Sequence, residues 1–181
     1  DSFYKEKFDS RYSIALINVA SPKSHHSLNK VSRPEANVIV EILGDLLNHG
    51  ILPNQVGIIA PFRAQVAEIR RLIELNLFSY FKRSEDIKPI VDTVDRFQGD
   101  ERDVIIFSLT LIDENIPELL QDIRRLNVAI SRARKKFIGV GNWDNVGGSE
   151  TLMHLKEYVE QSDKSILINS SEICNLPDGI L

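Results

Sequence analysis

Residues 124–142 read RRLNVAISRARKKFIGVGN, and they decide the fold because a helical pattern runs directly into an apolar strand. At about 100° per residue, one stripe of this helix is apolar and is expected to pack inward: Leu126, Ile130 and Ala133. Phe137 is expected to start the strand. The adjacent stripe holds Arg125, Ala129 and Arg132, so that a small alanine separates two guanidiniums. Arginine suits phosphate oxygens, since its planar fork forms paired hydrogen bonds, although a solvated basic face would have the same pattern.

The composition is that of one globular domain. The chain has 181 residues, of which 43% are hydrophobic and 27% charged, which is enough to build a full core. The net charge is -4 and the sequence pI about 5.6, so a global basic field is excluded as the basis of nucleic-acid binding. Six of the 22 Lys and Arg residues fall between Arg124 and Lys136. This positive island therefore needs an explanation of its own.

The expected cellular context follows from residue patterns that the sequence lacks. Cys174 is the one cysteine of the chain, which excludes an internal disulfide and a cysteine-based zinc site. No apolar run reaches the roughly 18 residues of a membrane span, so a soluble protein of the reducing cytoplasm is expected, with no membrane partner. The first residues are charged and lead straight into a predicted strand, which indicates a fragment of a longer chain.

Apolar runs alternate with helical patterns along the chain. The runs predict strands at residues 13–19, 56–60, 90–94, 104–112 and 137–141. Helical spacing predicts helices that begin near Arg33, at Arg63, within the arginine segment and near Glu150. Such alternation is typical of an α/β fold with a mostly parallel sheet and helices on both faces. Ligands of these sheets collect beyond the carboxyl ends of the strands.

Three polar segments are expected to converge there into an anion site: APFRAQ at residues 60–65, TVDRFQGDERD at 93–103 and RRLNVAISRAR at 124–134. The loop G-x-x-x-x-G-K-[ST] that would cradle phosphates is missing, because none of the nine glycines precedes a lysine. The chain is therefore not a self-sufficient P-loop hydrolase. It could supply half of a nucleotide site.

Three segments resemble, in order, motifs IV, V and VI of superfamily 1 helicases: VGIIAPFRAQV at 56–66, VDTVDRFQGDERDVIIFSL at 91–109 and RRLNVAISRARKKFIGVGN at 124–142. The resemblance is closest to the branch with the nonsense-mediated-decay RNA helicases and the helicase-nucleases of DNA replication, and it covers roughly residues 33–145. It implies that residues 1–181 form one domain, the second (C-terminal) RecA-like domain, with a P-loop-NTPase-type fold but no P-loop of its own. The first RecA-like domain, with Walker A and Walker B, would precede residue 1.

The resemblance implies catalytic roles for two arginines. Arg132, in SRAR where the family usually has TRAR, resembles the arginine finger that reaches the γ-phosphate across the interdomain cleft. Such a finger raises the rate roughly 10³- to 10⁵-fold. Arg63 matches the motif IV arginine, a second γ-phosphate contact in many relatives. From the residues alone, Arg63 could instead be a solvated side chain at a helix N-terminus, where the helix dipole disfavours it unless an anion is bound.

Further positions match family residues that contact the nucleotide or the nucleic acid. By resemblance, the nucleotide-binding positions are Gln98, Gly99, Glu101 and Arg125, and the single-strand backbone contacts are Pro61, Phe62 and Thr93. Gln98 and Gly99 match the turn that faces the γ-phosphate, and Glu101 matches the glutamate that bonds the ribose. Gly99 could instead serve only as a tight turn, and Thr93 could be an ordinary strand residue. A third stripe of the helix is expected to form structural hydrogen bonds first and ligand contacts second: Asn127, Ser131 and Arg134.

The resemblance as a whole implies ATP-dependent helicase activity in a longer protein. ATP would bind between two RecA-like domains, with Mg²⁺ held mainly by the N-terminal one, and single-stranded DNA or RNA would be the polymer partner. The isolated chain is expected to hydrolyse ATP negligibly. No metal site of its own is expected, since His25 and His26 have no ligand at suitable spacing. The alternatives are a non-catalytic RecA-like module that docks a partner protein or nucleic acid, and a nuclease or defence ATPase that carries this motor.

Overall fold

A parallel sheet forms the centre of the protein. The structure, a computed structural model, describes residues 12–20, 30–97, 100–110 and 118–172. In these residues six strands pair in the order β3-β2-β4-β5-β1-β6, and every pair is parallel. The strands are β1 (Ile14–Asn18), β2 (Val56–Ala60), β3 (Val91–Thr93), β4 (Arg102–Ser108), β5 (Ala133–Gly141) and β6 (Ser165–Asn169). The expected α/β class with a parallel sheet is confirmed.

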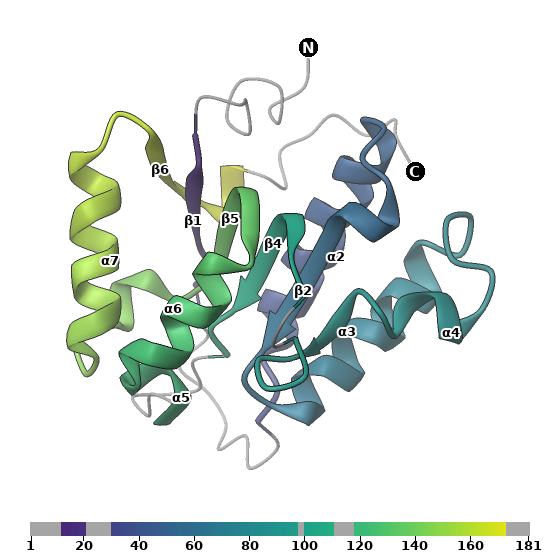
Figure 1. Cartoon of the computed structure of the whole chain (residues 1–181), viewed down its shortest axis with the longest axis horizontal. Helices are drawn as coiled ribbons and strands as arrows, with labels where there is room; N and C mark the ends of the chain where they lie inside the picture. Colours follow the sequence, from purple (N-terminus) through teal and green to yellow (C-terminus); the bar gives the residue numbers. More distant parts are fainter. Residues whose placement is uncertain (1–11, 21–29, 98–99, 111–117, 173–181) are drawn as a thin grey trace.

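Helices cover both faces of the sheet (Figure 1). They are α2 (Arg33–Asn48), α3 (Arg63–Asn76), α4 (Ser84–Ile87), α5 (Glu118–Gln121), α6 (Ile123–Ser131) and α7 (Glu150–Gln161), with short 3-10 turns η1 (Pro53–Gln55), η2 (Trp143–Asn145) and η3 (Ser170–Glu172). Ala15 and Ile17 belong to the core cluster beneath α2 and α3, whereas Leu16 between them belongs to the cluster beneath α5, α6 and α7. Because side chains alternate along a strand, both faces are buried, which explains the continuous apolar runs.

The connections decide which ends of the elements meet. All strands are parallel, so their carboxyl ends share one edge of the sheet, here named the carboxyl edge, and their amino ends share the opposite amino edge. Helices that follow a strand begin at the carboxyl edge, as α2 does at Arg33 and α3 at Arg63. α6 also runs toward the amino edge, because β5 follows it directly. The last residue of α6, Ser131, therefore lies at the amino edge.

The arginine segment differs from its prediction at the boundary between helix and strand. α6 ends at Ser131 and β5 begins at Ala133, so the strand starts four residues before Phe137. Inside α6 the buried residue next to Leu126 is Ala129, whereas Ile130 is half-buried. Ala133 pairs with Arg102 of β4, and this pairing outweighs the helix propensity of the sequence that follows Ser131.

Two other strands also differ from their predictions. β4 covers Arg102–Ser108 and so lies earlier at both ends than residues 104–112. The left-handed backbone of Thr110, with φ of 51°, marks the end of the extended segment. β6 was not predicted, although it pairs with β1 over its full length. A short apolar run after a polar turn does not distinguish a strand from a loop.

Candidate functional site

The motif IV residues lie at the carboxyl edge of the sheet. β2 ends at Ala60, Phe62 is the N-cap residue of α3, and Arg63 is the first residue of that helix. The Arg63 side chain is exposed and forms no ion pair with any described residue. α3 has no acidic residue in its first turn. The positive end of the helix dipole and the Arg63 guanidinium therefore both favour an anion at this turn.

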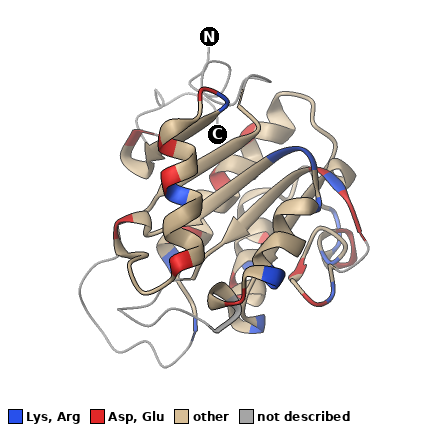
Figure 2. Ribbon diagram, turned by 60° about the vertical axis from the view of Figure 1, so that its left-hand side comes forward, with Lys and Arg blue, Asp and Glu red and all other residues tan. Residues whose placement is uncertain are grey.

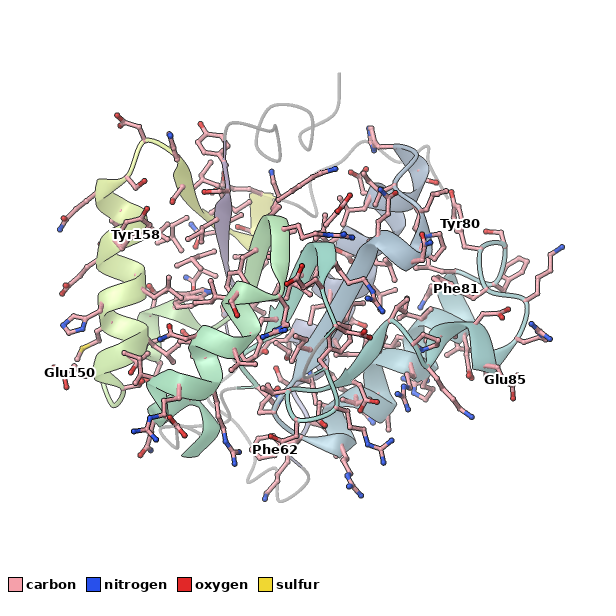
Figure 3. All side chains as sticks on the ribbon, viewed as in Figure 1. Phe62, Tyr80, Phe81, Glu85, Glu150 and Tyr158 are labelled. Atoms are coloured by element: carbon pink, nitrogen blue, oxygen red, sulfur yellow. The ribbon has the colours of Figure 1, made fainter. Side chains whose placement is uncertain are left out.

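Thr93 lies beside the same turn. It pairs with Ala60 where β2 and β3 end, and it is half-buried. One face of the Phe62 ring carries a cation, since Lys30 Nζ lies 4.9 Å from the ring centroid. Figure 3 shows Phe62 at the lower margin of the molecule. The structure thus brings together the residues predicted to contact a single strand, namely Pro61, Phe62 and Thr93.

The segment after Thr93 crosses the sheet on the face that carries α6. The backbone N–H groups of Arg96 and Phe97 donate to the Thr93 carbonyl at 3.1 and 3.0 Å. Phe97 is 3% exposed and belongs to the same core cluster as Leu126 of α6. A Cβ on Gly57 of β2 would stand 2.7 Å from Phe97 Cζ. The glycine therefore leaves the space in which this ring lies against the sheet.

The crossing segment and the arginine helix meet at the amino edge. Arg102, the first residue of β4, donates its backbone N–H to the Arg132 carbonyl at 3.0 Å. Arg132 caps the C-terminus of α6, and its Nε donates to the Val128 carbonyl at 3.3 Å. Its side chain forms no ion pair within the described ranges. Glu101 is exposed next to Arg102, so the backbones that carry Glu101 and Arg132 lie together.

The two catalytic candidates stand at opposite edges of the sheet. Arg63 begins a helix at the carboxyl edge, and Arg132 ends a helix at the amino edge. β4, from Arg102 to Ser108, spans about 20 Å at about 3.3 Å per residue. The predicted convergence of all three segments at the carboxyl ends was therefore wrong. Because β5 follows α6 directly, the C-terminal end of α6 lies at the amino edge, where β5 begins. Glu101 precedes β4 and lies at the same edge.

The predicted arginine stripe is not an open face of α6. Ala129 is 0% exposed and lies in the core, so it admits no ligand between two guanidiniums. Arg125 has a half-exposed side chain whose Nε lies 3.9 Å from Asp122 Oδ2. Ser131 Oγ donates to the Val128 carbonyl at 3.0 Å, which agrees with the structural hydrogen bonding predicted for its stripe.

A carboxylate at the amino edge neutralises part of the positive island. Asp103 of β4 accepts hydrogen bonds from Lys135 Nζ at 2.9 Å and Gln55 Nε2 at 3.1 Å, and Arg134 Nε lies 3.1 Å from its other oxygen. The hydrogen bond from Lys135 is the main cause that holds the pKa of Asp103 below its ordinary value. Figure 2 shows a continuous stretch of Lys and Arg on the ribbon of the sheet. Arg134 is thus a paired strand residue and not part of a helical stripe, whereas Arg132 forms no ion pair within the part of the chain that the structure describes.

Arg102 was not predicted as a site residue. Its side chain is 17% exposed, and its guanidinium carbon lies 5.5 Å from the centroid of the Phe97 ring. The sequence shows only an arginine that follows two acidic residues in GDER, a pattern equally typical of a solvated ion pair. Its burial depends on contacts that no local pattern contains.

Several predictions fall on residues outside the described ranges: Gln98, Gly99, His25, His26 and Cys174. Among the described residues, no group of three or more His, Cys, Asp or Glu side chains could hold a metal ion. Each helix in that part of the chain is too short or too polar to span a membrane.

Residues 2–144 match the protein family described as AAA domain. The match covers more than half of the chain, and the chain therefore belongs to this family. The parallel six-stranded sheet with helices on both faces is the RecA-like α/β fold that the family implies.

Several helicases are similar to this chain. DNA polymerase alpha-associated DNA helicase A of Saccharomyces cerevisiae is 34% identical over 137 residues, which are 74% of this chain and 19% of that protein. The DNA replication ATP-dependent helicase/nuclease dna2 of Schizosaccharomyces pombe is 31% identical over 141 residues, 77% of this chain and 9% of that protein. The Regulator of nonsense transcripts 1 homolog of Drosophila melanogaster is 32% identical over 152 residues, 83% of this chain and 12% of that protein. The expected resemblance to this branch of superfamily 1 helicases is confirmed, and the chain spans less than a fifth of the length of each of these relatives.

Proposed function

We propose that this chain is the C-terminal motor domain of an ATP-dependent superfamily 1 helicase. It would supply an arginine finger, Arg132, to an ATP site shared with an N-terminal RecA-like domain. The observation that carries the proposal is the environment of Arg132. Its guanidinium has no carboxylate partner among the described residues. Its backbone carbonyl accepts a hydrogen bond from the N–H of Arg102, the residue that follows Glu101.

An arginine finger places positive charge where negative charge develops on the γ-phosphate. Arg134 and Lys135, close to Arg132 in the chain, are both paired with Asp103. Among the described residues, the Arg132 side chain forms only a 3.3 Å hydrogen bond to a carbonyl of its own helix. Such a long bond is easily given up for a phosphate oxygen. These contacts favour Arg132 over its basic neighbours as the ligand-binding residue.

The remaining nucleotide contacts would come from residues 98–101 and from α6. Glu101 would accept a hydrogen bond from the ribose, and Gln98 and Gly99 would face the γ-phosphate. Arg125 would add positive charge from the start of α6. The Arg132 guanidinium, which forms no ion pair with any described residue, fits a phosphate group. Mg²⁺ would be held mainly by the N-terminal domain, which would also carry the P-loop that is missing from this sequence.

The carboxyl edge would bind the nucleic acid. Pro61, Phe62 and Thr93 lie together there, and an aromatic ring beside a cation suits the bases and backbone of a single strand. Phosphate and backbone contacts serve DNA and RNA alike, so the proposed partner is a single strand of either DNA or RNA. Arg63 lies at this edge, and the length of β4, about 20 Å, separates it from the edge that carries Arg132. The γ-phosphate contact is therefore proposed for Arg132 alone.

Arg132 would couple nucleotide occupancy to domain closure, because it can pair with the γ-phosphate only when the two domains meet. We further propose that residues 1–181 are one RecA-like domain, with its motifs in roughly residues 33–145, within an intracellular helicase. By itself this domain would hydrolyse ATP negligibly, since most of the nucleotide site would be supplied by the other domain.

The test is Arg132→Ala in the polypeptide that joins this domain to its P-loop domain. Turnover of ATP in the presence of a single strand should fall by about 10³-fold or more, while binding of a fluorescent ATP analogue stays nearly unchanged. Arg134→Ala is the matched control, because it removes an arginine two positions away that is paired with Asp103 at 3.1 Å. Unchanged turnover in Arg132→Ala would favour a non-catalytic binding module.

A further inference from the structure

Arg102 is a largely buried arginine at the amino edge, with a side chain that is 17% exposed. Its guanidinium carbon lies 5.5 Å from the centroid of the Phe97 ring. That ring is held in the core, where Phe97 is 3% exposed. The cation is thus stacked on an aromatic group whose own position is fixed by the sheet.

The same guanidinium holds the neighbouring loop by hydrogen bonds. Nη1 donates to the Glu101 carbonyl at 2.9 Å, and Nη2 donates to Asp100 Oδ2 at 3.2 Å. The backbone N–H of Asp100 donates to the Phe97 carbonyl at 3.2 Å. One side chain therefore contacts Phe97, Asp100 and Glu101.

The backbone of Arg102 ties this loop to α6. Its N–H donates to the Arg132 carbonyl at 3.0 Å. The register between β4 and β5 shifts between Arg102 and Val104, so the pair of Arg102 and Ala133 is out of step with the rest of the ladder. The place of Arg132 relative to the loop therefore depends on how Arg102 is held.

We infer that Arg102 is a positioning residue, which sets Glu101 against Arg132 and so fixes the distance between the ribose contact and the arginine finger. The effect on catalysis rests on the proposed function. The ordering of the loop does not, because it follows from contacts within this chain.

The choice of arginine at this position supports the inference. Arg102 Nε is buried and has no hydrogen-bond partner among the described residues, and a buried donor without an acceptor destabilises a fold. A lysine would bring no such donor. It would also lack the planar group that stacks on a ring while two nitrogens donate in fixed directions. The geometry of the guanidinium is thus what this position requires.

Hydrogen exchange in the protein tests the ordering of the loop. In Arg102→Lys and Arg102→Met, the backbone amides of Asp100 and Arg102 should exchange about tenfold faster or more, since each variant loses hydrogen bonds to a charged group. The control is Arg96→Met, because Arg96 is 67% exposed and its Nη1 lies 4.0 Å from Asp92 Oδ2. Its effect on those amides should be small. Phe97→Leu removes the ring and keeps the guanidinium, so it should reproduce part of the effect even if Arg102→Met folds poorly.

Kinetics test the consequence for the site. In the two-domain protein, both Arg102 variants should raise KM for ATP about tenfold, by loosening Glu101, and lower kcat as well by displacing Arg132. Normal exchange and normal KM in Arg102→Lys would overturn the inference, because a charge alone would then suffice. Faster exchange in the Arg102 variants with no effect of Arg132→Ala on turnover would keep the positioning role and overturn the proposed function instead.

Discussion

Glu35 and Thr110 join α2 to the end of β4 by a buried hydrogen bond, in which the Thr110 N–H donates to Glu35 Oε2 at 2.7 Å. Ser108 Oγ donates to the same oxygen at 2.7 Å, and Gln65 Nε2 of α3 donates to Ser108 Oγ at 3.1 Å. These four residues are at most 1% exposed. Thr110 has a φ of 51°, a strained value for a β-branched residue. One carboxylate therefore holds the chain in its turn after β4.

Glu35→Ala is expected to destabilise the fold strongly. It leaves a buried N–H and a buried hydroxyl without their acceptor, which costs about 2 to 4 kcal/mol. Urea unfolding of the 181-residue chain measures the change as a lower midpoint at constant slope. Glu74→Ala, at an exposed position of α3, is the control and should change the free energy by less than about 0.5 kcal/mol. Equal midpoints for the two variants would contradict the role of the carboxylate.

Gly57→Ala is expected to displace the segment that crosses the sheet. An added Cβ would stand 2.7 Å from both Phe97 Cζ and Ile105 Cδ1, so the ring must move, at a cost of about 1 to 3 kcal/mol. Thermal unfolding and exchange at the Phe97 amide both report the change. Gly147→Ala is the matched control, since nothing lies within 4 Å of a Cβ there. If Gly57→Ala were as stable as this control, Phe97 would not be held against β2 as described.

Asp103 should make the stability depend on pH. The hydrogen bond from Lys135, aided by Gln55 and Arg134, lowers the pKa of Asp103. A carboxyl with a lowered folded pKa contributes stability above its unfolded pKa and loses it as the pH falls through the folded value. The Tm difference between the wild type and Asp103→Asn should therefore be largest above about pH 5 and shrink below about pH 4. A constant Tm difference for Asp103→Asn across this pH range would contradict the pairing.

The buried strands could be predicted because a parallel sheet covered on both faces requires continuous apolar runs. β2 has the predicted bounds, Val56–Ala60. α2 could be placed because Pro34 fits its first turn, and it ends at Asn48 just before Gly50. The start of β5 was missed since Arg134 and Lys135 are unusual at the start of a buried strand, and their pairing with Asp103 lies some thirty positions away in the chain.

The sequence supplied candidate site residues but not their relative placement. Motif order singled out Arg63 and Arg132 as candidates, yet no local pattern shows which sheet edge a helix end reaches. That depends on the strand that follows the helix, and β5 carries Arg132 to the amino edge. Arg102 was missed for a related reason, since its guanidinium stacks on Phe97, whose ring lies against Gly57 of a different strand. Long-range contacts thus decide both the placement of the finger candidate and the residue that holds it.

Phe62→Ala is expected to weaken the binding of a single strand at the carboxyl edge. The ring lies 4.9 Å from Lys30 Nζ, beside the end of β3, and loss of one base-stacking ring costs about 1 to 3 kcal/mol, which is about 10- to 100-fold in affinity. Fluorescence anisotropy with labelled DNA and RNA oligonucleotides at one fixed salt concentration measures this change. Phe78→Ala is the control, because Phe78 is a phenylalanine that is 72% exposed and distant in the chain from the three motifs. An equally small loss of affinity in both variants would mean that the oligonucleotide binds elsewhere on the protein. A loss of affinity confined to Phe62→Ala would tie single-strand binding to the turn between β2 and α3.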